Sequence, residues 1–479
     1  MRIDEDRRTV VMLLCVILLV FLLHACTKDT TAQIPPQEEL QEVVLHTPPG
    51  SPGISVSFSD DPDEDDTELD TEEVVFEYTP DYYYSNHTDP DERQYLTILA
   101  DPSQLIYGAP VFAVVYEPLM DIGDIRFAGF DQPMPYYGYD MRWCDLSEFD
   151  LSFITDLQLI NFSTQTVWPD SLPEGFDPDI IVELGKNPGL GIRALHDAGI
   201  TGEGVGIAII DGALLLDHEQ YRHNLMYYER IHCPAEHAEF HGSLVSSIAV
   251  GQDTGVAPDA KLYYIATQMG HFTRLGTFDF DAGIVADCIY RILEVNEYLP
   301  DNEKIRVISI SRGYWKTDKN VWLLEEAIQA AESENIFVIT ASPEQYYTNF
   351  EWYWMDCDYL CDRDDPGSYR PATLLETSYI DRPGRYRNTV FFPAGSRTVA
   401  CSTGVGEYMV VSQGSLSLVT PWCAGLYAMC CQADPDITPD RFVSLVYETA
   451  LTTTLEYDGS AYEFGLIVNP IGIVSELMR

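Results

Sequence analysis

Residues 202–212 read GEGVGIAIIDG, and this stretch decides the fold. Its centre, 204–210, is a nearly continuous apolar run rich in β-branched side chains, which is typical of a parallel strand buried on both faces. Asp211 and Gly212 follow directly at its carboxyl end. Because the functional sites of open α/β sheets lie beyond the carboxyl ends of their strands, Asp211 is a candidate site residue.

Strand and helix patterns alternate after this run. Apolar stretches at 260–266, 306–310 and 336–340 predict three further strands. Residues 281–298 carry apolar side chains at spacings of three and four, which predicts an amphipathic helix. This alternation predicts an α/β fold with a mostly parallel central sheet flanked by helices.

One candidate site is the cluster His232, Cys233, His237 and His241, with Glu239 between the last two histidines. Its segment HAEFH superficially resembles the zinc-peptidase signature H-E-x-x-H. The glutamate follows the first histidine by two residues, however, so on a helix it would face away from both imidazoles. A metal-dependent hydrolase is therefore our third choice of function, after the two that are described below. We expect neither a metal nor a cofactor.

A second candidate site is dispersed along the chain. Asp211 follows a strand, His241 opens a helix, and Ser417 opens another helix. A serine hydroxyl is a poor nucleophile unless a base takes its proton, which histidine does near neutral pH. An aspartate can hold that histidine in the required tautomer. The three residue types together predict nucleophilic catalysis.

The sequence around these residues resembles the subtilisin-like serine peptidases. HGSLV (241–245) with GVAPDAKLYYIA (255–266) is similar to the family's histidine block and the strand after it. SLVTPWCAG (417–425) is similar to the family's serine block, and GLIVNP (465–470) to its closing segment. The order Asp, His, Ser is also the family's order. The resemblance covers roughly residues 180–475.

This resemblance implies a subtilisin-like three-layer fold and a serine endopeptidase that cleaves peptides or proteins through an acyl-enzyme intermediate. Asp211, His241 and Ser417 would be the catalytic residues. ISRG (310–313) is similar to the segment whose backbone pairs with substrate, so residues Ser311, Arg312 and Gly313 would bind substrate.

The sequence departs from the family pattern in several places. Leu244 stands where the family has a second histidine, and Ser-Leu stands at 415–416 where it has Gly-Thr. Pro343 is aligned with the family's oxyanion asparagine and has neither a side-chain donor nor an N–H. Asn349 is the nearest amide side chain after it. The runner-up function is therefore a catalytically weak or inactive subtilase-fold lipoprotein that binds peptides.

Composition limits the partners. The 479 residues include 77 acidic and 27 basic side chains, a net charge of −50. Nucleic-acid binding depends on Lys and Arg neutralising phosphates, so this composition excludes a nucleic-acid partner. If the negative charge surrounds the substrate cleft, it would attract basic peptides. If the charge lies on faces far from the cleft, it would not, and the composition leaves both possibilities open.

The N-terminus predicts export. Three arginines precede a 14-residue apolar run, 10–23, which is shorter than the about 20 residues that a membrane span needs. LHAC (23–26) resembles the lipobox of bacterial lipoproteins, whose cysteine is lipidated. We therefore expect an extracytoplasmic protein anchored to the cell membrane by lipid on Cys26, the alternative being an uncleaved signal anchor.

Four segments follow from these patterns. Residues 1–26 would be the signal, and 27–92 an acidic disordered linker, because 19 acids and no Lys or Arg lie between Asp29 and Glu92. Residues 93–178 would be an N-terminal extension of unknown role, with strand-like runs at 95–99 and 111–116 and a short Asp-Leu-Ser repeat from 145 that is either a stack or a series of turns. Residues 179–479 would be the peptidase domain.

The cysteines beyond the signal are odd in number once Cys26 carries lipid, so not all can pair. Adjacent Cys430 and Cys431 on an expected helix should face the core or be free thiols. Cys357 and Cys361 are the expected disulfide, the alternative being half a zinc site.

Lipidation of Cys26 can be tested directly. Replacing it with alanine should abolish labelling of the full chain by a palmitate analogue in cells, because the acylated thiol is removed. A Cys15→Ala variant, which changes a cysteine inside the apolar run, is the matched control and should still be labelled. Unchanged labelling of the Cys26→Ala variant would contradict the lipoprotein assignment.

Overall fold

The computed structural model describes residues 111–112, 119–120, 138–154, 156–233, 235, 237–272, 278–342 and 350–479. The predicted signal, linker and 95–99 strand lie outside these residues, as do 113–116 of the next strand. Within the described part, no helix has the length and apolar character needed to cross a membrane.

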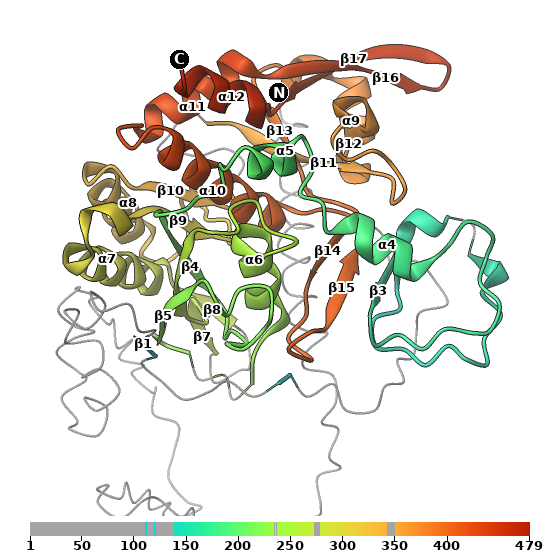
Figure 1. Ribbon diagram of the computed structural model, residues 1–479, viewed down its shortest axis with the longest axis horizontal. Helices are drawn as coiled ribbons and strands as arrows, with labels where there is room; N and C mark the ends of the chain where they lie inside the picture. Colours follow the sequence, from blue (N-terminus) through green and yellow to red (C-terminus); the bar gives the residue numbers. More distant parts are fainter. Residues whose placement is uncertain are drawn as a thin grey trace, which may run out of the picture. The chain divides into compact units, whose positions relative to one another are not determined.

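The central sheet has six strands, all parallel, in the order β1-β5-β6-β4-β9-β10. Its strands are β1 Val111–Phe112, β4 Gly206–Asp211, β5 Leu225–Arg230, β6 Lys261–Ala266, β9 Ile305–Ile310 and β10 Phe337–Thr340. The four predicted strands are β4, β6, β9 and β10, so the parallel α/β prediction is confirmed (Figure 1).

Helices cover both faces of this sheet and make three layers. Ile207 and Ile209 of β4 pack toward α6 Phe240–Val250 and α10 Leu416–Ala433. Ala208 and Ile210 pack toward α7 Ala282–Tyr298 and α8 Val321–Ser333. Every residue of β4 is buried, as expected for a strand whose two faces both contact helices.

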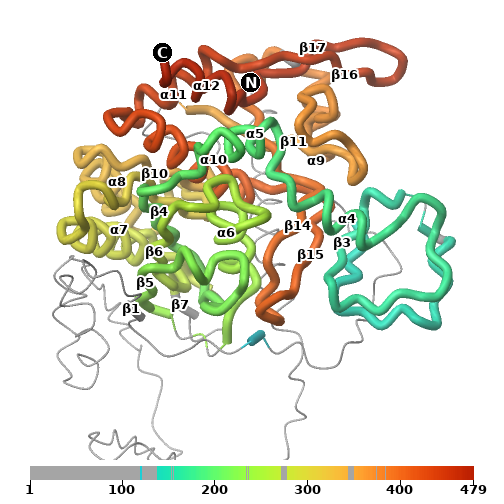
Figure 2. Tube along the Cα trace, in the orientation of Figure 1, coloured from blue at the N-terminus to red at the C-terminus, as the bar shows by residue number. Residues whose placement is uncertain are grey.

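Two further sheets and a hairpin surround this core, and the chain path is easiest to follow in Figure 2. One sheet runs β12-β11-β13-β17-β16, the other β14-β15-β3-β2, and β7 pairs with β8. The strands are β2 Tyr139–Asp140, β3 Ile160–Ser163, β7 Gly270–Phe272, β8 Phe278–Phe280, β11 Trp352–Cys357, β12 Tyr369–Pro371, β13 Val390–Pro393, β14 Arg397–Ala400, β15 Tyr408–Val411, β16 Leu451–Tyr457 and β17 Ser460–Ile467. The remaining helices are α4 Pro178–Gly185, α5 Ile192–Asp197, α9 Thr373–Asp381, α11 Pro439–Thr449 and α12 Pro470–Leu477.

Residues 138–178 share hydrogen bonds with the rest of the chain. β3 pairs antiparallel with β15, with Met409 opposite Ser163 and Val410 opposite Phe162. The Asp-Leu-Ser repeat forms successive turns: the Oδ1 atoms of Asp145, Asp150 and Asp156 each accept a hydrogen bond from the backbone N–H two residues on. The sheet of β14 and β15 is therefore extended by strands of the N-terminal extension.

The nine described cysteines are all free thiols. Cys430 and Cys431 are buried in the core as expected. Cys357 and Cys361 are two of these free thiols, so the expected disulfide between them is not formed.

Helices α6 and α10 approach closely at Gly425 of α10. A Cβ there would lie 2.7 Å from the Val256 Cβ and 3.2 Å from the carbonyl oxygen of Ala249 in α6. His241 lies on α6 and Ser417 on α10, so this contact joins the two helices that carry these candidate catalytic residues.

Replacing Gly425 with alanine should therefore force the two helices apart. We expect the free energy of unfolding to fall by about 1–2 kcal/mol, because overpacking outweighs the better helix propensity of alanine. Denaturant unfolding measures this. Gly384→Ala is the matched control, since a Cβ there meets nothing within 4 Å. Equal midpoints for the two variants would contradict a tight helix contact.

Candidate active site

Asp211 and His241 are brought together by the end of β4 and the start of α6. Asp211 is the last residue of β4, and its side chain is 5% exposed. His241 is the second residue of α6, and its Nδ1 lies 2.7 Å from Asp211 Oδ1. The backbone N–H of Gly212 donates to the same oxygen at 2.8 Å. The carboxylate is therefore oriented by one backbone donor and faces one imidazole nitrogen.

Two opposing effects set the pKa of His241. Burial by itself lowers the pKa, because it disfavours the charged imidazolium. The charge of Asp211 and its hydrogen bond act in the other direction, with a smaller contribution from Glu239. The net result is a raised pKa for His241, so Asp211 stabilises the protonated imidazole.

Ser417 begins the other helix of the site. It is the second residue of α10, is half-buried, and follows the N-cap residue Ser415. Its Oγ donates to the carbonyl oxygen of Ser311 at 3.2 Å, while Ser311 Oγ donates to the Ser417 carbonyl at 2.9 Å. Of the described groups, Ser311 is the hydrogen-bond partner of the Ser417 hydroxyl, and His241 is not.

The candidate substrate-binding residues follow strand β9. Arg312 N donates to the Ile310 carbonyl at 2.7 Å, and its own carbonyl accepts from Ala341 N at 2.9 Å. A Cβ on Gly313 would lie 2.8 Å from the Ala341 carbonyl oxygen, so this close approach requires glycine. Residues Ser311, Arg312 and Gly313 thus pass from the end of β9 alongside Ala341, with Ser311 in contact with Ser417.

The oxyanion prediction is not tested by this geometry. Pro343 and Asn349 both lie outside the described residues, which end at Ser342 and resume at Phe350.

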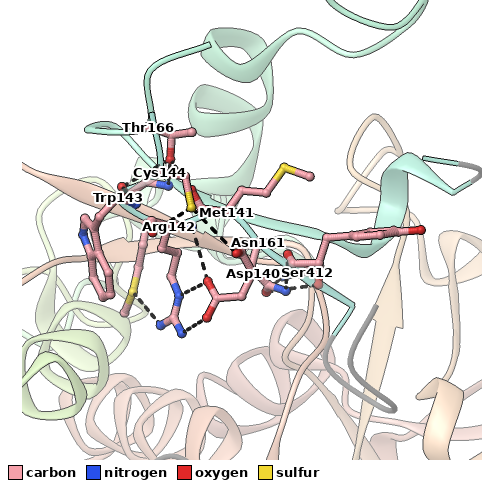
Figure 3. A network of polar contacts seen from close by, with 11 residues as sticks. Asp140, Met141, Arg142, Trp143, Cys144, Asn161, Thr166 and Ser412 are labelled. Carbon is pink, nitrogen blue, oxygen red and sulfur yellow. Dashed lines mark hydrogen bonds and ion pairs between the residues drawn. The ribbon is translucent and has the colours of Figure 1, made fainter. Parts of the chain in front are cut away.

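The N-terminal extension contacts residues near His241 and residues near Ser417, which the sequence did not indicate. The carboxylate of Asp140 accepts from Nε and Nη2 of Arg142 at 2.8 and 2.7 Å. Figure 3 shows the two groups facing each other. That guanidinium also lies 5.5 Å from the ring centroid of Phe240, the residue before His241.

A second contact of the extension holds the segment that leads to α10. Asn161 Oδ1 accepts from both N and Oγ of Ser412, at 2.9 and 3.1 Å (Figure 3). Two residues on, Gly414 N donates to the buried carboxylate of Asp356 at 2.9 Å. These partners are about 250 and 60 residues apart in the chain, so no local sequence pattern reveals them.

The histidine cluster does not form the arrangement that a helical metal site requires. Helix α6 begins at Phe240, so His237 precedes the helix and the two histidines do not share a helical face. His232 and His237 are exposed. Across the residues that the structure describes, no group of three or more His, Cys, Asp or Glu side chains could hold a metal ion.

A comparison with known protein families identifies the chain. The sequence model of the subtilase family matches residues 202–466, more than half of the 479 residues. The chain belongs to the subtilase family. Serine peptidase is therefore its general class, and the three-layer α/β architecture is the fold of this family.

The subtilase chain was also compared with curated and solved proteins. No curated protein matches its sequence. The prenylagaramide maturation protease PagA is 15% identical, with 60% of this chain and 98% of PagA covered and a TM-score of 0.42. A cold-adapted subtilisin-like serine proteinase is 16% identical, with 52% of this chain and 83% of that chain covered and a TM-score of 0.34.

The pairing of His241 with Asp211 has a consequence that NMR can measure. The imidazole of His241 should titrate above the ordinary value of about 6.5, and the Asp211→Asn variant should move its midpoint below that value, because burial is then opposed only by the smaller effect of Glu239. The stabilisation from this pair is present in full below the unfolded-state pKa and is lost as the pH rises through the raised folded-state pKa.

Two other histidines serve as internal references. Burial lowers the pKa of His196 and of His218, so both should titrate below His241 in the same spectra. Glu239→Gln is the matched variant and should lower the His241 midpoint by less than Asp211→Asn does. An unchanged midpoint in Asp211→Asn would show that the two side chains are not paired in solution.

Proposed function

We propose that this subtilase is a serine endopeptidase that hydrolyses peptide bonds through Asp211, His241 and Ser417. The observation that supports this most is the 2.7 Å contact between His241 Nδ1 and Asp211 Oδ1. An aspartate that accepts from Nδ1–H leaves Nε2 as the basic nitrogen. His241 is then in the tautomer that can take a proton from a serine hydroxyl.

The reaction would begin at the Ser417 hydroxyl. Its hydrogen bond to Ser311 is exchanged for one to His241 Nε2, which removes the proton as Oγ attacks the substrate carbonyl. The tetrahedral intermediate collapses to an acyl-enzyme when His241 returns the proton to the leaving amine. A water molecule, deprotonated by the same nitrogen, then releases the acid product.

Part of the oxyanion hole is available in α10. The backbone N–H of Ser417 lies in the first turn of this helix, where N–H groups have no intrahelical partner. The positive end of the helix dipole adds to its effect on a developing negative charge. Pro343, at the aligned position of the usual asparagine, contributes no side-chain amide. A missing donor of this kind typically lowers kcat by about 10²–10³.

The proposed location is outside the cytoplasm, with the chain attached to the cell membrane through lipid on Cys26. The signal-like segment and the LHAC sequence support this proposal. Peptides or proteins in that compartment would be the substrates.

An active-site label and a turnover assay together test the proposal. A fluorophosphonate should label the wild-type chain, because His241 activates the Ser417 hydroxyl, and should not label Ser417→Ala. Ser415→Ala is the matched control: its side chain makes no capping hydrogen bond, and this variant should still be labelled. Peptide hydrolysis should be slow and should disappear in Ser417→Ala.

Three results would count against the proposal. If the chain is neither labelled nor able to hydrolyse peptides, the peptide-binding alternative is favoured. The Ser417–Ser311 hydrogen bond and Pro343 support that alternative. Hydrolysis that survives Ser417→Ala would place the nucleophile elsewhere. Hydrolysis that a chelator abolishes would favour the metal-dependent alternative.

A further inference from the structure

Arg312 directly follows the residue whose carbonyl contacts the candidate nucleophile. The residue before it, Ser311, accepts the hydrogen bond of the Ser417 hydroxyl at 3.2 Å, and consecutive Cα atoms are only about 3.8 Å apart. The side chain of Arg312 is half-buried, and its Cζ lies 3.7 Å from the ring centroid of Phe280. Stacking on this ring holds the guanidinium in place.

This arginine has no protein counterion among the described residues. Its Nε is buried without a hydrogen-bond partner, and its guanidinium forms no ion pair with a described carboxylate. Asp318 is the acid that its charge influences, but the carboxylate of Asp318 accepts from Trp315 N at 2.9 Å. Burial lowers the pKa of Arg312, so the protein holds this charge at a cost.

Other buried arginines of the chain differ from Arg312. Arg291 forms an ion pair with Glu229 at 3.0 Å, and Arg142 pairs with Asp140. Arg397 also has unpartnered nitrogens, but it is completely buried and no ligand can reach it. Of these four arginines, Arg312 alone combines an unpartnered guanidinium nitrogen, partial exposure and a position directly after Ser311, which contacts Ser417.

We propose that Arg312 is a specificity-determining residue that binds the side-chain carboxylate of an Asp or Glu next to the cleaved bond. The inference rests on the proposed peptidase function and adds a substrate class to it. A guanidinium presents two parallel N–H donors that match a carboxylate, and such charge-assisted pairs are among the strongest hydrogen bonds. An acidic side chain would supply the missing partner of this buried charge.

The net charge of the chain distinguishes a preference for acidic residues at this site from long-range electrostatic attraction by the whole protein. A net charge of −50 offers acidic peptides no long-range attraction, so a preference for them must come from a local contact. Salt screens the exposed long-range charges more than a partly buried pair. The preference for an acidic residue should therefore persist at physiological ionic strength.

Matched peptides test the proposal. Two fluorogenic peptides with amidated C-termini differ only in Glu or Gln on the acyl side of the cleaved bond. The wild-type chain should cleave the Glu peptide with a kcat/KM roughly tenfold higher, as expected for a charged hydrogen bond. A third peptide, with Gln and a free C-terminal carboxylate, should be cleaved like the amidated Gln peptide. A preference for this third peptide instead would overturn the side-chain assignment.

Variants assign the preference to Arg312. In Arg312→Met the Glu-to-Gln ratio should fall to within about twofold of one, and Arg312→Lys should keep part of it, because a point charge remains. Arg479→Met removes one exposed charge at the chain end and should leave the ratio unchanged. Thermal unfolding checks each fold, and Arg312→Gln replaces the Met variant if that variant is unfolded. No preference in the wild type, or an unchanged ratio in the neutral variants, overturns the proposal.

A binding arm separates this inference from the peptidase function. If no peptide is hydrolysed, the peptidase function fails, and peptide affinities are measured in the Ser417→Ala background with and without Arg312→Met. Tighter binding of the Glu peptide that Arg312→Met removes supports the role of Arg312. Equal affinity for both peptides overturns it.

Discussion

The site depends on one constraint: a strand buried on both faces must end where its first polar side chain can be paired. β4 consists of buried residues up to Asp211, whose side chain is 5% exposed. A carboxylate at that depth would be costly without partners. It receives the backbone N–H of Gly212 and the imidazole of His241. The position of α6 follows from this pairing, because His241 is only the second residue of that helix.

Close helix packing extends the same constraint to the nucleophile. Gly425 lets α10 approach α6 and the segment after it, with room for no Cβ. At the other end of the site, Ser311 and Ser417 exchange hydrogen bonds that join β9 to the start of α10. The segment before α10 is held by Asp356 and by Asn161 of the extension. The three candidate catalytic residues thus lie on elements joined by direct contacts rather than on free loops, which favours a preorganised site.

The sequence predicted those parts of the fold that depend on local patterns. The apolar runs of β4, β6, β9 and β10 and the periodicity of α7 require no distant partner, and the structure places these elements within one or two residues of the prediction. The contacts of Arg142 with Phe240 and of Asn161 with Ser412 could not be predicted, because each joins segments that meet only after folding. The same is true of Arg312. The sequence shows that residue 312 is an arginine in the candidate substrate-binding segment, but only the structure shows that it has no counterion among the described residues.

Charge acts on this site at two distances, and the two effects have opposite signs for an acidic peptide. Where the excess of 50 negative charges reaches the site it slows the approach of acids, and 19 of the acidic residues lie between Asp29 and Glu92, outside the matched family region. Arg312 acts only within hydrogen-bond reach, after a peptide has docked beside Ser417. At 0.15 M salt the screening length is about 8 Å, which weakens the first effect more than the second. Discrimination between acidic and neutral peptides would therefore arise in the bound state rather than in the encounter, and so in dissociation and in the chemical step.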